Sequence, residues 1–279
     1  MSKKRKLISA IIFAVVLIGL LVGIILTGGG KEEEPIKVVM KDAVLHETFK
    51  VNFFGTTVNP GLISAYVVTG IFFVFALIVR IFVIPKFKIV PGKFQLLLEK
   101  AVDLFDGLAG SNSPHRNKFL GAYIFTAGAY IFVGTVFELF GFQAITTSGS
   151  PIALPAPLAD INGAICMGVM SYSVILSGGI AGNGFKGVLN TLKDFSLPIS
   201  MSFRLFGALL SGVLVTELVY YFSAVSYVMP VFVGVMFTLL HALIQAYVLT
   251  MLTSLFYGEV SETSPKKNKK KNKVVVEDN

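Results

Sequence analysis

The stretch ISMSFRLFGALLSG, residues 199–212, decides the fold of this chain. It is mostly apolar, and Arg204 is its only charge. Placing an arginine at the centre of a bilayer costs at least ~2.5 kcal/mol on insertion scales, so such residues mark functional sites by default. The alternative is a side chain that snorkels to the interface, because Arg204 follows Phe195 by only nine residues. Arg204 is therefore the first candidate site residue.

The composition sets the class of protein. The 279 residues are 54% hydrophobic and 14% charged, whereas soluble domains carry about 25% charged residues. Several apolar runs reach the ~20 residues that a membrane-spanning helix needs. The sequence predicts an all-α polytopic membrane protein.

Apolar runs place about six membrane helices along the chain. The run at 7–27 is longer than the ~7–15 apolar residues of a signal peptide and shows no A-x-A cleavage site. These features favour a retained helix over a cleaved leader. Further spans are expected at 63–79, 119–140, 161–180 and 195–258, the last as two long helices with a break near 223–230.

Three segments between the spans carry other patterns. Residues 93–108 place apolar side chains at spacings of three and four, which predicts an amphipathic helix on the membrane face. Partial alternation over 36–54 indicates short strands. Residues 143–160 contain no lysine or arginine and are predicted to form a loop.

The charge distribution divides the chain and orients it. We expect an N-terminal membrane helix (1–27), an external polar segment (28–62), a membrane core (63–258) and a basic tail (259–279). Six crossings put every basic segment on one side, so both termini are expected in the cytoplasm. Beside membrane spans, the lysine run at 266–273 favours attraction to anionic lipids over nucleic-acid binding.

No cofactor or metal is expected from the residue types present. The single cysteine, Cys166, excludes an intrachain disulfide and a thiolate metal cluster. The histidines are too scattered to indicate a metal site. No G-x-x-x-x-G-K-[ST] motif occurs, so any nucleotide chemistry must belong to partner proteins.

Four segments together resemble those of F-type ATP synthase subunit a, and they occur in that family's order over roughly residues 56–258. They are VPGKFQ (90–95), PLADIN (157–162), FSLPISMSFRLFG (195–207) and IQAYVLTMLTSLFYG (244–258). The resemblance implies a non-catalytic, ion-translocating stator in the plasma or inner membrane of a bacterium. It implies as partners a c-ring of small two-helix subunits, the peripheral-stalk subunit b, the F1 ATPase through the complex, and H⁺ or Na⁺ as the transported ion.

The resemblance also assigns roles to two residues. The family's arginine on the penultimate helix corresponds to Arg204, between two half-channels and facing the carboxyl group of a c-ring subunit. Its glutamine on the last helix corresponds to Gln245, which is expected to line the channel and to face Arg204 and the ring, with helix–helix hydrogen bonding as the alternative. A guanidinium stays protonated at physiological pH. A carboxylate about 4 Å away would gain on the order of 4 kcal/mol at an effective dielectric of about 20, which promotes release of the bound ion.

Six other polar residues are candidates for lining the channels. Each also has a simpler interpretation: an interfacial carboxylate for Glu217 and Glu138, a hydrogen bond to a neighbouring helix for His241, and a solvated helix start for Asp194. Asp160 and Asn162 begin the fourth span, where an aspartate is a good N-cap. The six candidates are Glu217, His241, Glu138, Asn162, Asp160 and Asp194.

The chain departs from the family pattern at three positions. Ala208, Val213 and Thr238 stand where members usually carry Asn, Glu, and an acid or histidine. Glu217 lies four residues after Val213, and His241 lies three after Thr238, so each is one turn away on roughly the same helix face. We hypothesise that Glu217 and His241 replace the family's outer-channel pair.

Two other classes of function are weighed against this one. A secondary transporter could use Arg204 to bind an anionic substrate, but no second copy of the arginine segment indicates the repeats of such folds. An intramembrane enzyme would need a nucleophile with a base, or paired aspartates. No H-E-x-x-H motif occurs, and Asp160 has no intramembrane aspartate partner.

Overall fold

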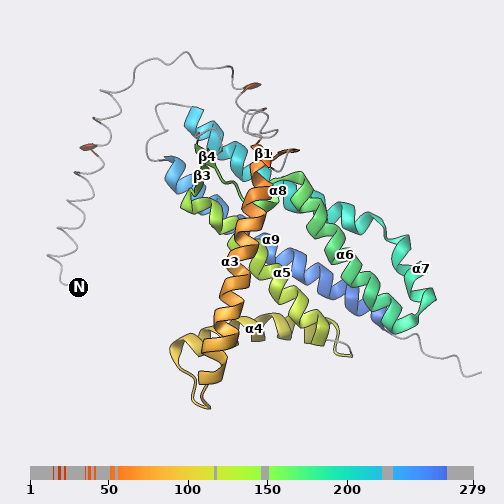
Figure 1. The fold of residues 1–279 in the computed structure, drawn as a ribbon. Coiled ribbons are helices and arrows are strands. Elements are labelled where there is room, and N and C mark those ends of the chain that lie inside the picture. Colours follow the sequence, from red (N-terminus) through yellow and green to blue (C-terminus); the bar gives the residue numbers. More distant parts are fainter. Residues whose placement is uncertain are drawn as a thin grey trace, which may run out of the picture.

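The computed structural model describes residues 51–53, 56–115, 118–145, 151–221 and 229–262, together with a few isolated positions before residue 42. The predicted helix at 7–27, most of the strand segment at 36–54 and most of the basic tail at 259–279 lie outside the described residues. The main elements in Figure 1 are α3 (Pro60–Ile78), α4 (Lys93–Asn112), α5 (Lys118–Phe137), α6 (Ile161–Asn183), α7 (Phe185–Lys193), α8 (Ser196–Tyr221) and α9 (Met229–Ser261).

Five helices in the described part of the chain are long and apolar enough to cross a membrane, which confirms an all-α polytopic membrane protein. The predicted spans at 119–140 and 161–180 agree closely with the observed helices. The predicted double span at 195–258 is also present as two long helices, with the intervening 222–228 outside the described residues. The five spans are Pro60–Lys86, Phe119–Phe140, Ile161–Asn183, Ser196–Tyr221 and Met229–Ser261.

The first of these spans is longer than predicted. The sequence predicts a span at 63–79 closed by Arg80, Pro85, Lys86 and Lys88, but the helix begins at Pro60 and continues past Ile78 as a π-helical turn, Val79–Val83, and a 3₁₀ turn, Ile84–Lys86. A single exposed arginine does not end a helix near the interface, because its long side chain can extend to the polar headgroups. The helical conformation ends only after Pro85, whose ring removes a backbone donor.

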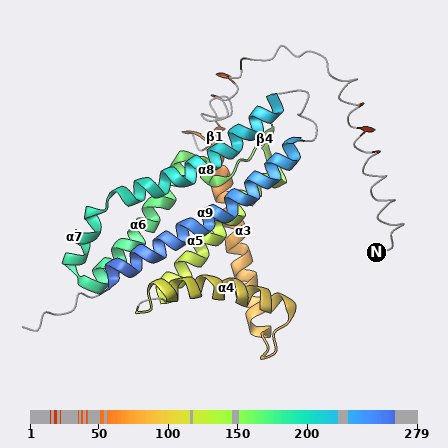
Figure 2. The same ribbon diagram turned by 180° about the vertical axis from the view of Figure 1, so that it is seen from behind.

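The hydrophobic core is formed where α5, α6, α8 and α9 meet. Its fully buried side chains include Leu120, Ile124 and Ile131 of α5, Ile175 of α6 and Leu205 of α8. By contrast, α3 stands at one side of this bundle (Figures 1 and 2). Only 6% of the most apolar stretch of its span is buried inside the protein, against 44% for the spans of α5 and α6. The four-helix core therefore fixes the geometry of α8 and α9.

Glycines bring these helices close together. A Cβ on Gly168 of α6 would lie 2.9 Å from the carbonyl oxygen of Pro198 on α8. A Cβ on Gly178 would lie 2.7 Å from the ring of Tyr257 on α9. Small residues at helix contacts allow the close backbone approach that stabilises bundles in lipid. α6 thus packs closely against both α8 and α9, the two helices that carry the strongest candidate residues.

The connections contain more structure than the sequence predicts. The segment 143–160, expected to be a loop, forms the antiparallel hairpin β3 (Gln143–Ile145) and β4 (Pro151–Ala153), followed by a 3₁₀ turn at Pro157–Ala159. A second hairpin pairs β1 (Val51–Phe53) with β2 (Thr56–Val58), which confirms short strands at the end of 36–54. The short helix α7 was not predicted.

The predicted amphipathic helix at 93–108 is present as α4 and extends to Asn112. It runs across the ends of α3 and α5 rather than alongside them (Figure 2). Phe105 and Leu108 pack against the core, whereas Leu97 and Leu104 are exposed. This is the arrangement expected for a helix in the membrane interface.

Candidate functional site

Arg204 lies on an exposed stripe along one face of α8. The opposite face buries Met201, Leu205 and Leu209 in the core, at the spacing of one helical turn. Apart from Phe203, the exposed stripe carries only small residues around the arginine. Its members are Ser200, Phe203, Arg204, Gly207 and Ser211.

This stripe is open to an outside partner. A Cβ built on Gly207 meets no atom within 4 Å. Among the described residues, no hydrogen bond or ion pair joins Arg204 to another side chain. A charge inside an apolar helix is normally paired, and the described part of the chain supplies no counter-charge for Arg204.

The contact between Gly212 and His241 sets the register of α8 and α9. A Cβ on Gly212 would lie 3.2 Å from Nδ1 of His241, so the imidazole packs directly against the α8 backbone. The same imidazole and the ring of Phe237 make a T-shaped contact, with 5.8 Å between the ring centroids. α8 and α9 run antiparallel (Figures 1 and 2). Gln245 therefore lies level with Ala208, about 6 Å along the axis from Arg204.

Gln245 is placed differently from Arg204. Only 6% of its surface is exposed, and Ala242, Ala246 and Leu249 around it are buried as well. Its side chain is thus directed into the bundle rather than onto the exposed stripe. Gln245 is therefore near Arg204 but not on its exposed face, and no described hydrogen bond decides between a channel-lining role and a contact between helices.

The outer-channel candidates occupy the far end of the same helix pair. Glu217 is half-buried on α8 and lies thirteen residues beyond Arg204, a rise of about 20 Å. His241 is half-buried against Gly212, between the levels of these two residues. Both candidates therefore lie on the same side of Arg204 along the axis of α8, without a described contact between them.

Glu138 and Asp160 lie at the two ends of the segment that connects α5 to α6: Glu138 follows α5, and Asp160 precedes α6. The Glu138 carboxyl accepts a hydrogen bond from the backbone of Ala156. Asp160 is buried and caps α6, with Oδ1 accepting from the backbone N of Asn162 at 3.0 Å and from its Nδ2 at 3.2 Å. Asn162 itself is exposed. For Asp160 the capping interpretation thus has direct geometric support.

Asp194 is exposed at the turn between α7 and α8. Its backbone N–H donates to the Thr191 carbonyl at 3.1 Å, and its carbonyl accepts from Leu197 at 3.0 Å. The hydroxyl of Tyr172 donates to the same Thr191 carbonyl at 3.0 Å and so ties α6 to this turn. Asp194 therefore stands at the start of the arginine helix, on the side opposite Glu217.

Two tyrosines that sequence reasoning missed make polar contacts between the spans. The Tyr123 hydroxyl and Ser171 Oγ are 2.8 Å apart, joining α5 to α6. Tyr130 hydrogen-bonds the side chain of Thr69 and so joins α5 to α3. The only signal in the sequence was a hydroxyl within an apolar run, which does not say what it contacts. In the described part of the chain, no group of three His, Cys, Asp or Glu residues could hold a metal ion.

Comparisons with known proteins identify relatives. The family described as ATP synthase A chain matches residues 62–258, more than half of the chain. A protein named ATP synthase subunit a from Haemophilus ducreyi is 26% identical over 202 residues, covering 60% of this chain and 76% of the relative. A protein named ATP synthase subunit a, sodium ion specific, from Propionigenium modestum is 22% identical over 239 residues, covering 80% and 81%. The relative from Cereibacter sphaeroides, also named ATP synthase subunit a, is 26% identical over 180 residues, covering 60% and 69%.

Proposed function

Because this chain belongs to the ATP synthase A chain family, we propose that Arg204 faces the mid-membrane carboxyl groups of a rotating c-ring, between two half-channels. The chain is a multi-pass membrane protein and a non-catalytic, ion-translocating subunit of the membrane sector of an ATP synthase. Family membership does not favour the alternative of a secondary transporter.

The exposed guanidinium of Arg204, which pairs with no side chain in the described part of the chain, carries the proposal. The residues around it at Ser200, Gly207 and Ser211 are small, so a ring helix can approach the α8 backbone closely. A ring carboxyl that reaches Arg204 is held in its ionised form and releases its ion. The same fixed positive charge repels a cation that would otherwise pass straight from one half-channel to the other.

The half-channels lie on the two sides of Arg204. The outer one is lined by Glu217 and His241 between α8 and α9, and its mouth lies near Glu138 and Asn162. The inner one begins at Asp194, at the exposed turn before α8. The position of Glu217 and Asp194 on opposite sides of Arg204 supports this offset. Asp160 contributes by holding the first turn of α6.

The remaining assignments concern partners and location. The specific partners are the c-ring, subunit b and the F1 ATPase, and the cargo is H⁺ or Na⁺. The membrane is that of a bacterium, as for the named relatives. Both termini lie in the cytoplasm, where the basic tail meets anionic lipids. Epitope accessibility in sealed spheroplasts tests the orientation, and a terminus reached from outside would contradict it.

The test of the proposal is the Arg204→Ala variant of the assembled complex in sealed vesicles. Gradient-driven ATP synthesis should fall to background, while the ATPase detached from the membrane keeps its full rate. Lys186→Gln, which removes an exposed cation on α7, should leave synthesis unchanged. Synthesis that persists with alanine at this position would overturn the role of Arg204. Co-purification of the c-ring from mild detergent checks that the variant assembles.

A further inference from the structure

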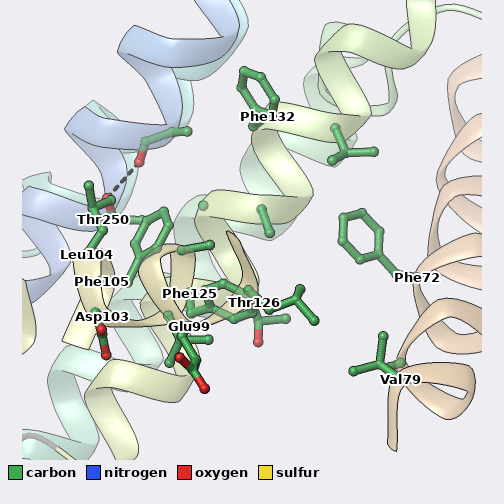
Figure 3. A pocket seen from close by; sticks show the side chains of 18 of the residues that line it. Phe72, Val79, Glu99, Asp103, Leu104, Phe105, Phe125, Thr126, Phe132 and Thr250 are labelled. Carbon is green, nitrogen blue, oxygen red and sulfur yellow. Dashed lines mark hydrogen bonds between the residues drawn. The ribbon is translucent and has the colours of Figure 1, made fainter. Parts of the chain in front are cut away.

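A large apolar groove lies between α3 and the helix bundle. Its volume is about 1390 Å³, and it is lined by α3, α4, α5 and a short part of α9. Pockets for drug-sized ligands usually measure ~300–1,000 Å³. In Figure 3, Phe72 of α3 and Val79 of the π-helical turn face Phe105 and Phe125 across open space. The groove is therefore wide enough for a molecule with long apolar chains.

The groove exists because α3 packs against the rest of the protein only from Gly61, which lies beside Asp160, to Phe72, whereas residues 73–78 are exposed. The rings of Phe72 and Tyr130 are 6.2 Å apart, and Tyr130 hydrogen-bonds the side chain of Thr69. From this level toward Arg80, Phe75 and Ala76 of α3 and Val79 of the π-helical turn line the groove. An unfilled apolar groove would forfeit dispersion contacts, so its occupant is apolar over most of its length.

Charges of both signs border the same groove. Arg80 of the π-helical turn lines it, as do Glu99 and Asp103 of α4. Gln95 Nε2 donates to Glu99 Oε1 at 2.7 Å, but no ion pair joins Arg80 to either carboxylate within the described part of the chain. A guanidinium and two carboxylates thus stand beside apolar walls without neutralising each other.

We propose that this groove binds a phospholipid whose headgroup carries both a phosphate and a primary ammonium, as phosphatidylethanolamine does. Its acyl chains lie against the phenylalanines, its phosphate accepts from Arg80, and its ammonium donates to Asp103 and Glu99. Charge complementarity selects this headgroup. An anionic glycerol headgroup leaves the carboxylates without a partner, and a choline headgroup has no N–H to donate. The lipid fills the space between α3 and the bundle.

The experiment measures lipid retained by the complex. The wild-type complex is purified in mild detergent and transferred into nanodiscs that contain equimolar ethanolamine, glycerol and choline phospholipids, so that these replace its native lipids. The lipids that stay bound are then identified by native mass spectrometry. We expect about one ethanolamine phospholipid per chain, as one groove requires. Arg80→Gln should reduce its retention about tenfold or more, the effect of losing one hydrogen bond between charged groups. Lys88→Gln, an exposed cation outside the groove, should not.

The carboxylates are tested by selectivity rather than by affinity. Asp103→Asn should reduce the preference for ethanolamine over choline phospholipid, whereas Asp106→Asn, one turn further along α4 and outside the groove lining, should keep it. Three results on folded, assembled complexes would each overturn the proposal. These are retention of the glycerol lipid in place of the ethanolamine lipid, retention unaffected by Arg80→Gln, and a photo-cross-linker at Phe132 that captures a partner subunit instead of lipid.

Discussion

The two halves of α9 differ in how the protein surrounds them. From Met229 to Leu240 only Pro230 is buried, and large side chains such as Met236 and Leu240 are exposed. Beyond this point the helix buries residues in pairs at every turn, among them Gln245 and Ala246. The outer half is the more apolar of the two in sequence but the less buried, so burial along α9 depends on the neighbours of each half in the fold.

Three contacts hold the inner end of α9, and we call them the inner clamp: Asn183 with Val260 and Glu262, His115 with Ser261, and Asn112 with Gly258. Asn183 Nδ2 donates to the carbonyls of Val260 at 3.1 Å and Glu262 at 2.8 Å. His115 Nε2 and Ser261 Oγ are 2.7 Å apart. Gly258 packs against the Asn112 carbonyl.

The clamp and the outer half have different consequences for the site. The clamp fixes the axial position of α9 and thereby sets His241 against Gly212. The outer half makes few contacts, which leaves the half-buried Glu217 and His241 accessible to polar partners. We therefore expect substitutions at the inner end to change stability and substitutions at the outer end to change ion transport.

The largest effect on stability is expected for Gly258→Ala. A Cβ there would collide with the backbone carbonyl of Asn112, which cannot move without shifting α4. Overpacking of this kind costs about 1–3 kcal/mol or more. Thermal unfolding in detergent should show a lower midpoint and a lower yield. Gly234→Ala is the matched control on the outer half, since a Cβ there meets nothing within 4 Å. Equal behaviour of the two variants would contradict the difference between the halves.

Asn183→Ala should have the second largest effect. It leaves the carbonyls of Val260 and Glu262 without their side-chain donor. Two hydrogen bonds of ~0.5–1.5 kcal/mol each predict a loss of about 1–3 kcal/mol in the free energy of unfolding. Asn190→Ala, an exposed position on α7, serves as control and should unfold like the unchanged protein. A comparable loss in both variants would remove the specific role of the clamp.

Ser261→Ala should have a smaller effect, about 1 kcal/mol, because it loses one hydrogen bond to His115. A double-mutant cycle with His115→Ala isolates that contact. We expect the two substitutions together to cost less than the sum of the single effects, by about 0.5–1.5 kcal/mol. Strict additivity would mean that the two side chains do not interact.

Glu217→Gln should have the smallest effect on stability, within about 0.5 kcal/mol as for most substitutions away from tight packing. ATP-driven ion pumping in vesicles should nevertheless fall severalfold, because an amide cannot exchange a proton or hold a cation by charge. Glu259→Gln removes an exposed carboxylate at the inner end of α9 and should leave pumping unchanged. Pumping that is unaffected by Glu217→Gln would exclude Glu217 from the outer half-channel.

The spans could be predicted because hydropathy is a local property of the chain. The run at 119–140 coincides with the observed span Phe119–Phe140. The first described span, Pro60–Lys86, is longer than the predicted 63–79 because the charge of Arg80 does not end the helix. The β3–β4 hairpin was missed because short strands rich in proline and serine carry no clear alternation.

The candidate site was predictable in part. Arg204 was identifiable because a lone charge in an apolar run is costly unless it has a function. The burial of Gln245 was not, since the apolar residues of α9 are spread around the whole helix and mark no buried face. Tyr123 and Tyr130 were missed for the same reason.

The amino-acid order alone specifies which segments cross the membrane and that one of them carries a cation, because both follow from transfer energies of nearby residues. Packing of α6 and α4 against the last helix determines which side of each segment meets protein and which meets lipid or a partner. That outcome depends on glycines and polar side chains far apart in the chain, such as Gly168 with Ser202 and Asn183 with Val260. Such contacts have no local pattern, so only the assembled bundle reveals them.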